Sequence, residues 1–208
     1  MVVSVSDFRT LIDSNPAERE VQRFLQTNRH LLIDFAPSRS AKIVRQFPLG
    51  QDFLADFAFV HTDSGGNYLR FLELESPKHR LFNLDDSFSR GFNVAVQQIH
   101  DWLSWCSGHQ DYLIEMIRPL LGFLKSEKIY FSGVLVIGRR GELLNNRRRQ
   151  ERFESRQSQG SFRIRTYNGF AEHLEADSPL IKRGNWCPPL YAYQKRGFVE
   201  IASSSHTV

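Results

Sequence analysis

Two apolar stretches separated by a turn stand out in the first third of the chain. Residues 53–60 and 68–76 are rich in Phe, Leu, Val and Tyr, which favour strands. Residues 63–66, Asp-Ser-Gly-Gly, lie between them and supply turn chemistry. The pattern therefore predicts a β-hairpin. Shorter apolar stretches predict further strands at 43–47, 131–137 and 162–167. Apolar residues at helical spacing predict a helix at 93–106, further helices are predicted at 7–12 and 111–125 with another starting at 169, and residues 142–156 read as a polar, arginine-rich helix.

The entry helix has the clearest start signal. In Asn15-Pro16-Ala17-Glu18 we expect Asn15 to be the N-cap and Pro16 the first helical residue, and Glu18 could close a capping box. The predicted order is helix, three meandering strands, helices, strand, helix, strand. This order indicates a mixed α/β fold with helices packed on a central sheet. We expect one domain over residues 1–208, with a weakly ordered tail from about residue 188.

The predicted hairpin gathers carboxylates on one face. Side chains two residues apart in a strand share a face, so Glu73 and Glu75 point the same way. A turn centred on Ser64-Gly65 places Asp56 opposite Glu73, and a turn centred on Gly65-Gly66 places it opposite Glu75. Like charges in such positions destabilise a sheet. An all-oxygen cluster suits Mg²⁺ or Mn²⁺, so we expect a bound cation.

Composition narrows the class of protein. The chain has 208 residues, a net charge of +4 and only two cysteines, Cys106 and Cys187, which have no metal-like spacing. No apolar run approaches the roughly 20 residues of a membrane span, and the first residues lack the pattern of a signal peptide. We therefore expect a cytoplasmic protein with free thiols and no membrane partner. The sequence leaves open whether the chain forms a homo-oligomer.

Positive charge is concentrated in one segment. Residues 139–156 contain seven arginines against three glutamates, a pattern that favours a polyanionic partner, most plausibly nucleic acid. The alternative is a solvated helix face held by salt bridges. We expect the following side chains to contact phosphates: Arg139, Arg140, Arg147, Arg148, Arg149 and Arg152.

Four motifs resemble a known family in their order along the chain. The entry helix reads EREVQRFLQTN, the hairpin reads ADF and FLELESP, the next helix reads AVQQIHDW, and the late strands read VLVIGRR and RIRTYNGF. Together they resemble the Shedu-type anti-phage defence nuclease domain of the PD-(D/E)XK superfamily, over about residues 18–174. The resemblance implies a restriction-endonuclease-like αβββαβ core and a Mg²⁺- or Mn²⁺-dependent endonuclease that acts on DNA.

The resemblance also implies roles for individual residues. Asp56 and Glu73 would hold the metal ion, and Glu18 would add a further carboxylate, although it could equally be a capping residue. Where the family pattern has a catalytic lysine, this chain has Glu75, which could complete a second cation site or act as general base. Lys78, beyond Pro77, is a candidate replacement for that lysine, or else an exposed surface residue.

Gln98 and Trp102 lie one helical turn apart, on one face of the predicted helix. In related nuclease families a glutamine at this point reaches the active site and an aromatic residue packs beside it. The alternative is an amide at the edge of the core beside a packed indole. The sequence thus predicts a DNA endonuclease. The substitution at Glu75 keeps open a second function, a catalytically weak or inactive nucleic-acid-binding module of the same fold.

Overall fold

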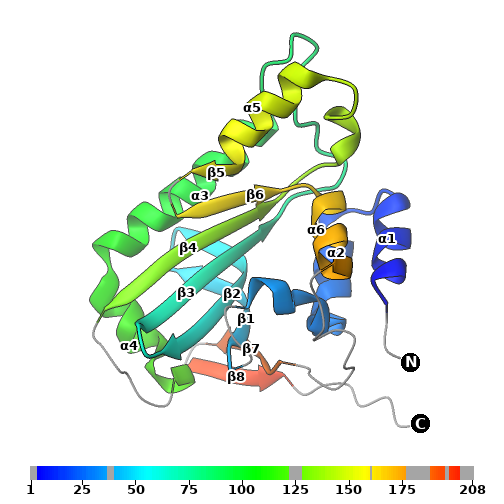
Figure 1. The fold of residues 1–208 in the computed structure, drawn as a ribbon. Coiled ribbons are helices and arrows are strands. Elements are labelled where there is room, and N and C mark those ends of the chain that lie inside the picture. Colours follow the sequence, from blue (N-terminus) through cyan, green and yellow to red (C-terminus); the bar gives the residue numbers. More distant parts are fainter. Residues whose placement is uncertain are drawn as a thin grey trace, which may run out of the picture.

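A single mixed sheet forms the centre of the molecule (Figure 1). The computed structural model describes residues 4–36, 40–121, 128–159, 161–176, 188–194 and 197–201. Within these residues the strands are β1 Lys42–Leu49, β2 Phe53–Asp63, β3 Gly66–Leu74, β4 Ile129–Val136, β5 Ser158–Gln159, β6 Phe162–Arg165, β7 Leu190–Gln194 and β8 Gly197–Ile201. Their order across the sheet is β5-β6-β4-β3-β2-β1-β7-β8. The strands β1, β2 and β3 form an antiparallel meander, and β4 and β6 continue it in parallel.

Helices cover both faces of this sheet. They are α1 Val5–Asp13, α2 Glu18–Thr27, α3 Arg90–Gly108, α4 Gln110–Leu121, α5 Arg147–Gln157 and α6 Tyr167–Ala176, with short 3₁₀ helices η1 Arg29–Phe35 and η2 Arg140–Glu142. One apolar core joins α3, α4 and α5 to one face, and the second joins α1, α2, η1 and α6 to the other. None of the described helices combines the length and the apolar character needed to span a membrane.

The predicted α/β class and the order helix, three strands, helix, strand are confirmed by α2, β1, β2, β3, α3 and β4. The start of α2 differs from the prediction. Asn15 has a left-handed backbone with φ of 52°, and Ala17 is the N-cap. The Ala17 N–H donates to Glu20 Oε2 at 2.6 Å, so Glu20 caps the helix start, and the predicted capping box of Asn15 with Glu18 does not form because the Asn15 N–H donates to the Ile12 carbonyl. The Glu18 side chain is therefore available elsewhere.

The prediction of a weakly ordered tail from residue 188 is wrong for residues 188–194 and 197–201. The strand β7 pairs in parallel with β1, with Ile43 opposite Leu190, and β8 pairs antiparallel with β7. Both strands are half-exposed, so they lack the apolar run that marks a buried strand. The strand β7 joins the sheet through backbone pairing with β1, about 150 positions earlier in the chain, and β8 then pairs with β7 alone.

The arginine-rich helix starts later than residue 142. Asn145 has φ of 61°, which separates η2 from α5. Asn146 then caps α5, because its Oδ1 accepts a hydrogen bond from the Arg149 N–H at 3.1 Å. The predicted helix at 111–125 is seen as α4, which contains Pro119 in its last turn. Residues 122–125 of that prediction lie outside the described residues, as does Cys187.

Candidate active site

The hairpin register settles how the carboxylates face each other. Asp63 pairs with Gly66 and Phe57 pairs with Leu72, so the turn centres on Ser64-Gly65 and Asp56 lies across from Glu73. The first of the two predicted registers is therefore the observed one. Two contacts tie the pair together. The Leu74 N–H donates to Asp56 Oδ2 at 2.9 Å, and the Asp56 N–H lies 3.4 Å from Glu73 Oε2.

Glu75 continues the same face just beyond β3. Its backbone N–H donates to the Val136 carbonyl at 2.9 Å, and its carbonyl accepts from the Tyr167 hydroxyl at 2.7 Å. Tyr167 is fully buried at the start of α6. Backbone bonds on both sides thus fix the position of Glu75 where β3, β4 and α6 meet.

Two amides, from helices on opposite faces of the sheet, reach this carboxylate pair. Gln22 of α2 donates to Asp56 Oδ1 at 2.6 Å and to Glu18 Oε1 at 3.0 Å. Gln98 of α3 donates to Glu73 Oε1 at 2.7 Å. The structure thus brings Glu18 and Gln98 to the predicted cluster. Gln22 was not predicted, although its i, i+4 spacing from Glu18 places it on the same side of α2.

Burial and mutual repulsion disfavour ionisation of these carboxylates. Burial first, and the nearby charges of Glu18 and Glu75 next, raise the pKa of Asp56 to about 7, against hydrogen bonds from Leu74 and Gln22. Burial and then the Asp56 charge raise the pKa of Glu73 to about 10. Burial also raises the pKa of Glu75. The Asp56 and Glu73 pair therefore retains a proton at neutral pH, as two interacting acids do.

The chemistry of the donor set fits a small divalent cation. Carboxylate oxygens are the ligands that Mg²⁺ and Mn²⁺ prefer, and a cation offsets the repulsion that now holds a proton in the pair. The present arrangement is not a finished coordination sphere. Among the described residues, no three His, Cys, Asp or Glu side chains form a group ready to hold a metal ion. The amides of Gln22 and Gln98 now donate to the carboxylate oxygens of Asp56 and Glu73. These oxygens would hold the ion only once the amides share them with it or release them.

The other two residues predicted for this region lie differently. Lys78 is exposed, and its side chain has no hydrogen bond or ion pair with any described residue. Trp102 is buried in the core of the α3 face and packs edge-on against Phe71, with ring centroids 6.1 Å apart. Trp102 thus supports the helix that carries Gln98, and its indole N–H is buried without a hydrogen-bond partner among the described residues.

The basic segment divides into arginines that hold the fold together and arginines that face solvent. Arg149 Nε donates to Asp86 Oδ1 at 2.5 Å, and both side chains are largely buried. Arg152 donates to the Asp86 carbonyl, and Arg139 donates to the Ile12 carbonyl and to Asp13. Three of the six arginines therefore anchor the loop before α3 or the end of α1.

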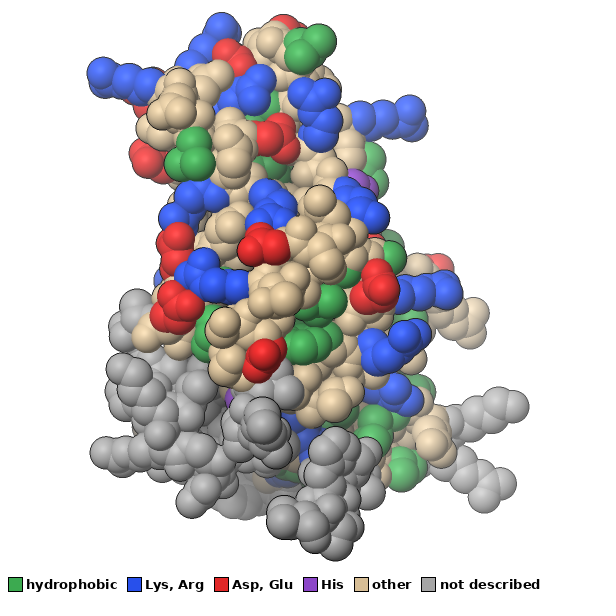
Figure 2. Space-filling view, turned by 90° about the vertical axis from the view of Figure 1, so that its right-hand side faces the viewer, with side chains coloured by type: hydrophobic (Ala, Val, Ile, Leu, Met, Phe, Trp, Pro, Cys, Tyr) green, Lys and Arg blue, Asp and Glu red, His purple; other side chains and the backbone are tan. Residues whose placement is uncertain are grey.

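The remaining arginines are more accessible. Arg147 is 90% exposed, and among the described residues it forms an ion pair only with Glu151, one turn along α5. Arg148 is exposed, without a hydrogen bond or ion pair to any described residue, and Arg140 pairs with Glu172 on the surface. Figure 2 shows Lys and Arg side chains interspersed with Asp and Glu on the face that it displays. The exposed charge of this segment is thus smaller than its composition suggests.

The fold and the site define a class: a mixed α/β protein with a buried carboxylate cluster where strands and helices from both faces of the sheet converge. The sequence matches the family described as Shedu protein SduA, C-terminal, over residues 15–170. The chain belongs to this family. The match includes Glu18, Asp56, Glu73, Glu75 and Gln98. A search of curated proteins found no match.

Proposed function

We propose that this protein is a metal-dependent endonuclease that hydrolyses phosphodiester bonds of DNA, with a role in prokaryotic anti-phage defence. The observation that carries the proposal is the convergence of Asp56, Glu73, Glu75 and Glu18 at one point of the sheet. A fold with only a structural use for these residues gains nothing from burying like charges together. The family match and the αβββαβ order of a PD-(D/E)XK nuclease support the same function.

Each side chain has a distinct task in this proposal. A bound Mg²⁺ would lower the pKa of its water and stabilise charge that develops on the phosphate oxygens. Asp56 and Glu73 would hold the ion at the point where Glu73 also receives the Gln98 amide. Gln22 would keep Asp56 and Glu18 at a fixed separation. The exposed arginines Arg147 and Arg148 would contact DNA phosphates, which orient a duplex without reading its sequence.

Two measurements test this function in order. Thermal unfolding with and without Mn²⁺ reports binding, because a ligand that binds only the folded state raises its stability. Incubation with supercoiled plasmid and Mg²⁺ or Mn²⁺, against an EDTA control, then reports cleavage. We expect stabilisation by Mn²⁺ and metal-dependent nicking. If the wild type shows neither stabilisation by Mn²⁺ nor metal-dependent nicking, the proposed function is contradicted.

The substitution of Glu75 for the lysine of the family pattern favours a second candidate, an inactive DNA-binding module. The variant Glu75→Lys separates the two. If the wild type binds DNA without cutting it and Glu75→Lys gains cleavage, the binding module is correct. If the wild type cuts and Glu75→Ala loses most of that activity, Glu75 is a working part of a nuclease.

A further inference from the structure

The side chain of Glu75 has a basic partner. His79 Nδ1 lies 3.1 Å from Glu75 Oε2, and the two side chains are 43% and 17% exposed. Within the described residues, no other basic side chain forms an ion pair with Glu18, Asp56, Glu73 or Glu75. The contact is not a well-directed hydrogen bond, because Nδ1 is buried without a hydrogen-bond partner. The exposed part of the His79 side chain therefore lies on atoms other than Nδ1.

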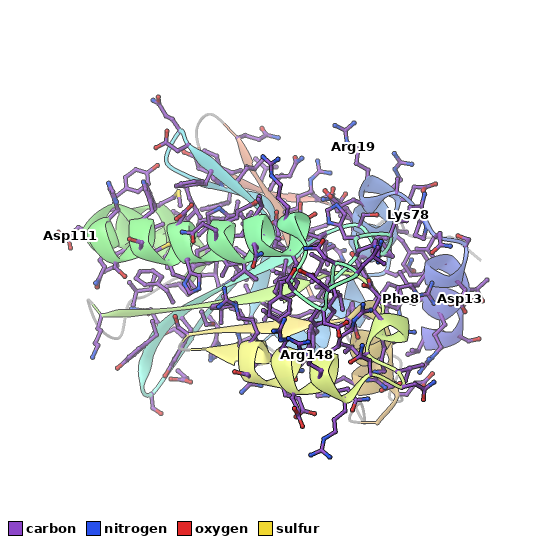
Figure 3. The ribbon with its side chains drawn as sticks, turned by 90° about the horizontal axis from the view of Figure 1, so that it is seen from above. Phe8, Asp13, Arg19, Lys78, Asp111 and Arg148 are labelled. Carbon is purple, nitrogen blue, oxygen red and sulfur yellow. The ribbon has the colours of Figure 1, made fainter. Side chains whose placement is uncertain are left out.

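A tight turn after β3 explains why residue 79 and not residue 78 faces the cluster. Pro77 cannot continue the ladder of β3. The His79 N–H then donates to the Ser76 carbonyl at 3.0 Å, and the Lys78 N–H donates to Ser76 Oγ at 3.2 Å. This turn brings the chain back over Glu75 at His79. The same turn leaves Lys78 exposed. Figure 3 labels Lys78 at the end of the molecule opposite Asp111.

Neighbouring backbone holds this turn in place. Gly138, with φ of +60°, passes so close that a Cβ at this position would lie 2.6 Å from the His79 carbonyl oxygen. Glu142 accepts hydrogen bonds from the Leu81 and Phe82 N–H groups at 2.8 and 3.1 Å. The chain on both sides of His79 is thus fixed by β3 and by the segment after β4. Reactive groups need such rigid support.

We propose that His79 is the general base of the reaction and that Glu75 is its positioning residue. This inference rests on the proposed nuclease function. Glu75 faces Nδ1 and so favours the tautomer in which Nδ1 carries the proton and Nε2 can accept one. Asp56 and Glu73 already receive the amides of Gln22 and Gln98. Among the described residues, His79 is thus the one basic side chain that forms an ion pair with the cluster, and the exposed part of its side chain lies away from Nδ1.

The chemical step balances without a redox partner. The oxygen of a water molecule forms a bond to phosphorus while the bond from phosphorus to the leaving sugar oxygen breaks. One proton of that water passes to His79 Nε2, and the leaving oxygen takes a proton from solvent. His79 then returns its proton to solvent, and the Glu75 carboxylate stabilises the imidazolium in between. General bases of this kind typically contribute about 10²–10⁴-fold in rate.

Chemical rescue tests this role. We expect His79→Ala to lower plasmid cleavage by about 10²-fold or more while its melting temperature and metal-induced stabilisation stay near those of the wild type. Added imidazole should then raise the cleavage rate of His79→Ala at least tenfold, because imidazole can occupy the vacated space and accept the proton. The same imidazole should not restore cleavage to Asp56→Asn, which lacks a metal ligand.

His109→Ala is the matched control. His109 follows α3, next to Asp111, and Figure 3 shows Asp111 and Lys78 at opposite ends of the molecule. This variant should cleave like the wild type. Full activity of His79→Ala would overturn the proposal, and so would a folded His79→Ala protein that imidazole does not rescue. Loss of activity in Lys78→Ala but not in His79→Ala would assign the role to Lys78. A wild type that never cleaves would instead overturn the nuclease function itself.

Discussion

The carboxylate cluster and the arginine-rich segment are both dense in charge, but they treat that charge in opposite ways. Glu73 is buried and Asp56 half-buried, and among the described residues this facing pair receives only neutral amide and backbone donors. Arg149 and Arg152, by contrast, are bound to Asp86 on the neighbouring loop. The Asp56 and Glu73 pair thus has no basic partner among the described residues, whereas several arginines of the basic segment are paired with carboxylates.

This difference indicates where a ligand is needed. A buried group that is left without compensation marks a functional site more strongly than a run of like residues, because the protein bears its energetic cost until a partner binds. The arginines bound to Asp86 need no partner. Within the basic segment, Arg147 and Arg148 therefore remain the candidates for DNA contact, and Arg140 joins them only when its ion pair with Glu172 opens.

The largest expected effect comes from removing one charge of the buried pair. Asp56→Asn and Glu73→Gln keep the size of the side chain but weaken metal binding. We expect each to reduce metal-dependent plasmid cleavage by at least about 10³-fold, since the Lewis-acid contribution is several kcal/mol. Thermal unfolding should show that both variants remain folded. Wild-type cleavage by either variant would remove that residue from the metal site.

The raised pKa of Asp56 predicts how stability depends on pH. A carboxyl group whose pKa rises on folding contributes most to stability below its unfolded pKa of 3.8, and this contribution is lost as the pH approaches about 7. Each pKa unit corresponds to about 1.4 kcal/mol, so Asp56 by itself should lower the free energy of unfolding of the metal-free protein by up to about 4 kcal/mol over this range. Chemical denaturation at several pH values measures it.

Asp56→Asn is the control for that profile, because an amide does not titrate. Its free energy of unfolding should change less between pH 4 and 7 than that of the wild type. Glu73 should continue to contribute at higher pH, since its own pKa is raised to about 10. If the free energy of unfolding of both proteins depends on pH in the same way, folding does not raise the pKa of Asp56.

Removing the Arg149 side chain should lower the free energy of unfolding more than removing that of Arg148, its neighbour on α5. Arg149→Ala leaves Asp86 largely buried without its ion pair and also removes the hydrogen bond to the Asn83 carbonyl at 3.1 Å. We expect a loss of about 2 kcal/mol in the free energy of unfolding. Arg148→Ala on the same helix should change it by less than about 0.5 kcal/mol. Similar values for both variants would contradict the division of the segment.

Local pattern was sufficient for most of the fold. The strands of the hairpin are apolar and the turn residues fix a two-residue loop, so the register of Asp56 against Glu73 was one of only two possibilities. The start of α2 was misjudged because Asn15 takes a left-handed conformation that lets the chain turn before Ala17. The strands β7 and β8 were missed because β7 pairs with the distant strand β1 and β8 is attached to the sheet only through β7.

The candidate site was predictable to the extent that it lies on one hairpin. Asp56, Glu73 and Glu75 follow from strand periodicity alone. Gln22 and His79 were not predicted, because a helix packing angle and a turn after Pro77 place them. Charge counting could not separate Arg149 from Arg148, since Asp86 lies about 60 positions away in the sequence. Spatial pairing decides which charges remain available.

The smallest expected effect concerns the exposed arginines. Replacing Arg147 and Arg148 together by Ala, with Arg149 kept so that the fold is undisturbed, should weaken binding of the protein to all duplex sequences about equally. Phosphate contacts release counterions, so the slope of log affinity against log salt should flatten by up to about two units, roughly 0.9 for each lost contact. Duplex affinity at several salt concentrations gives this slope. An unchanged slope would mean that α5 is a solvated face and that DNA, if bound, lies elsewhere.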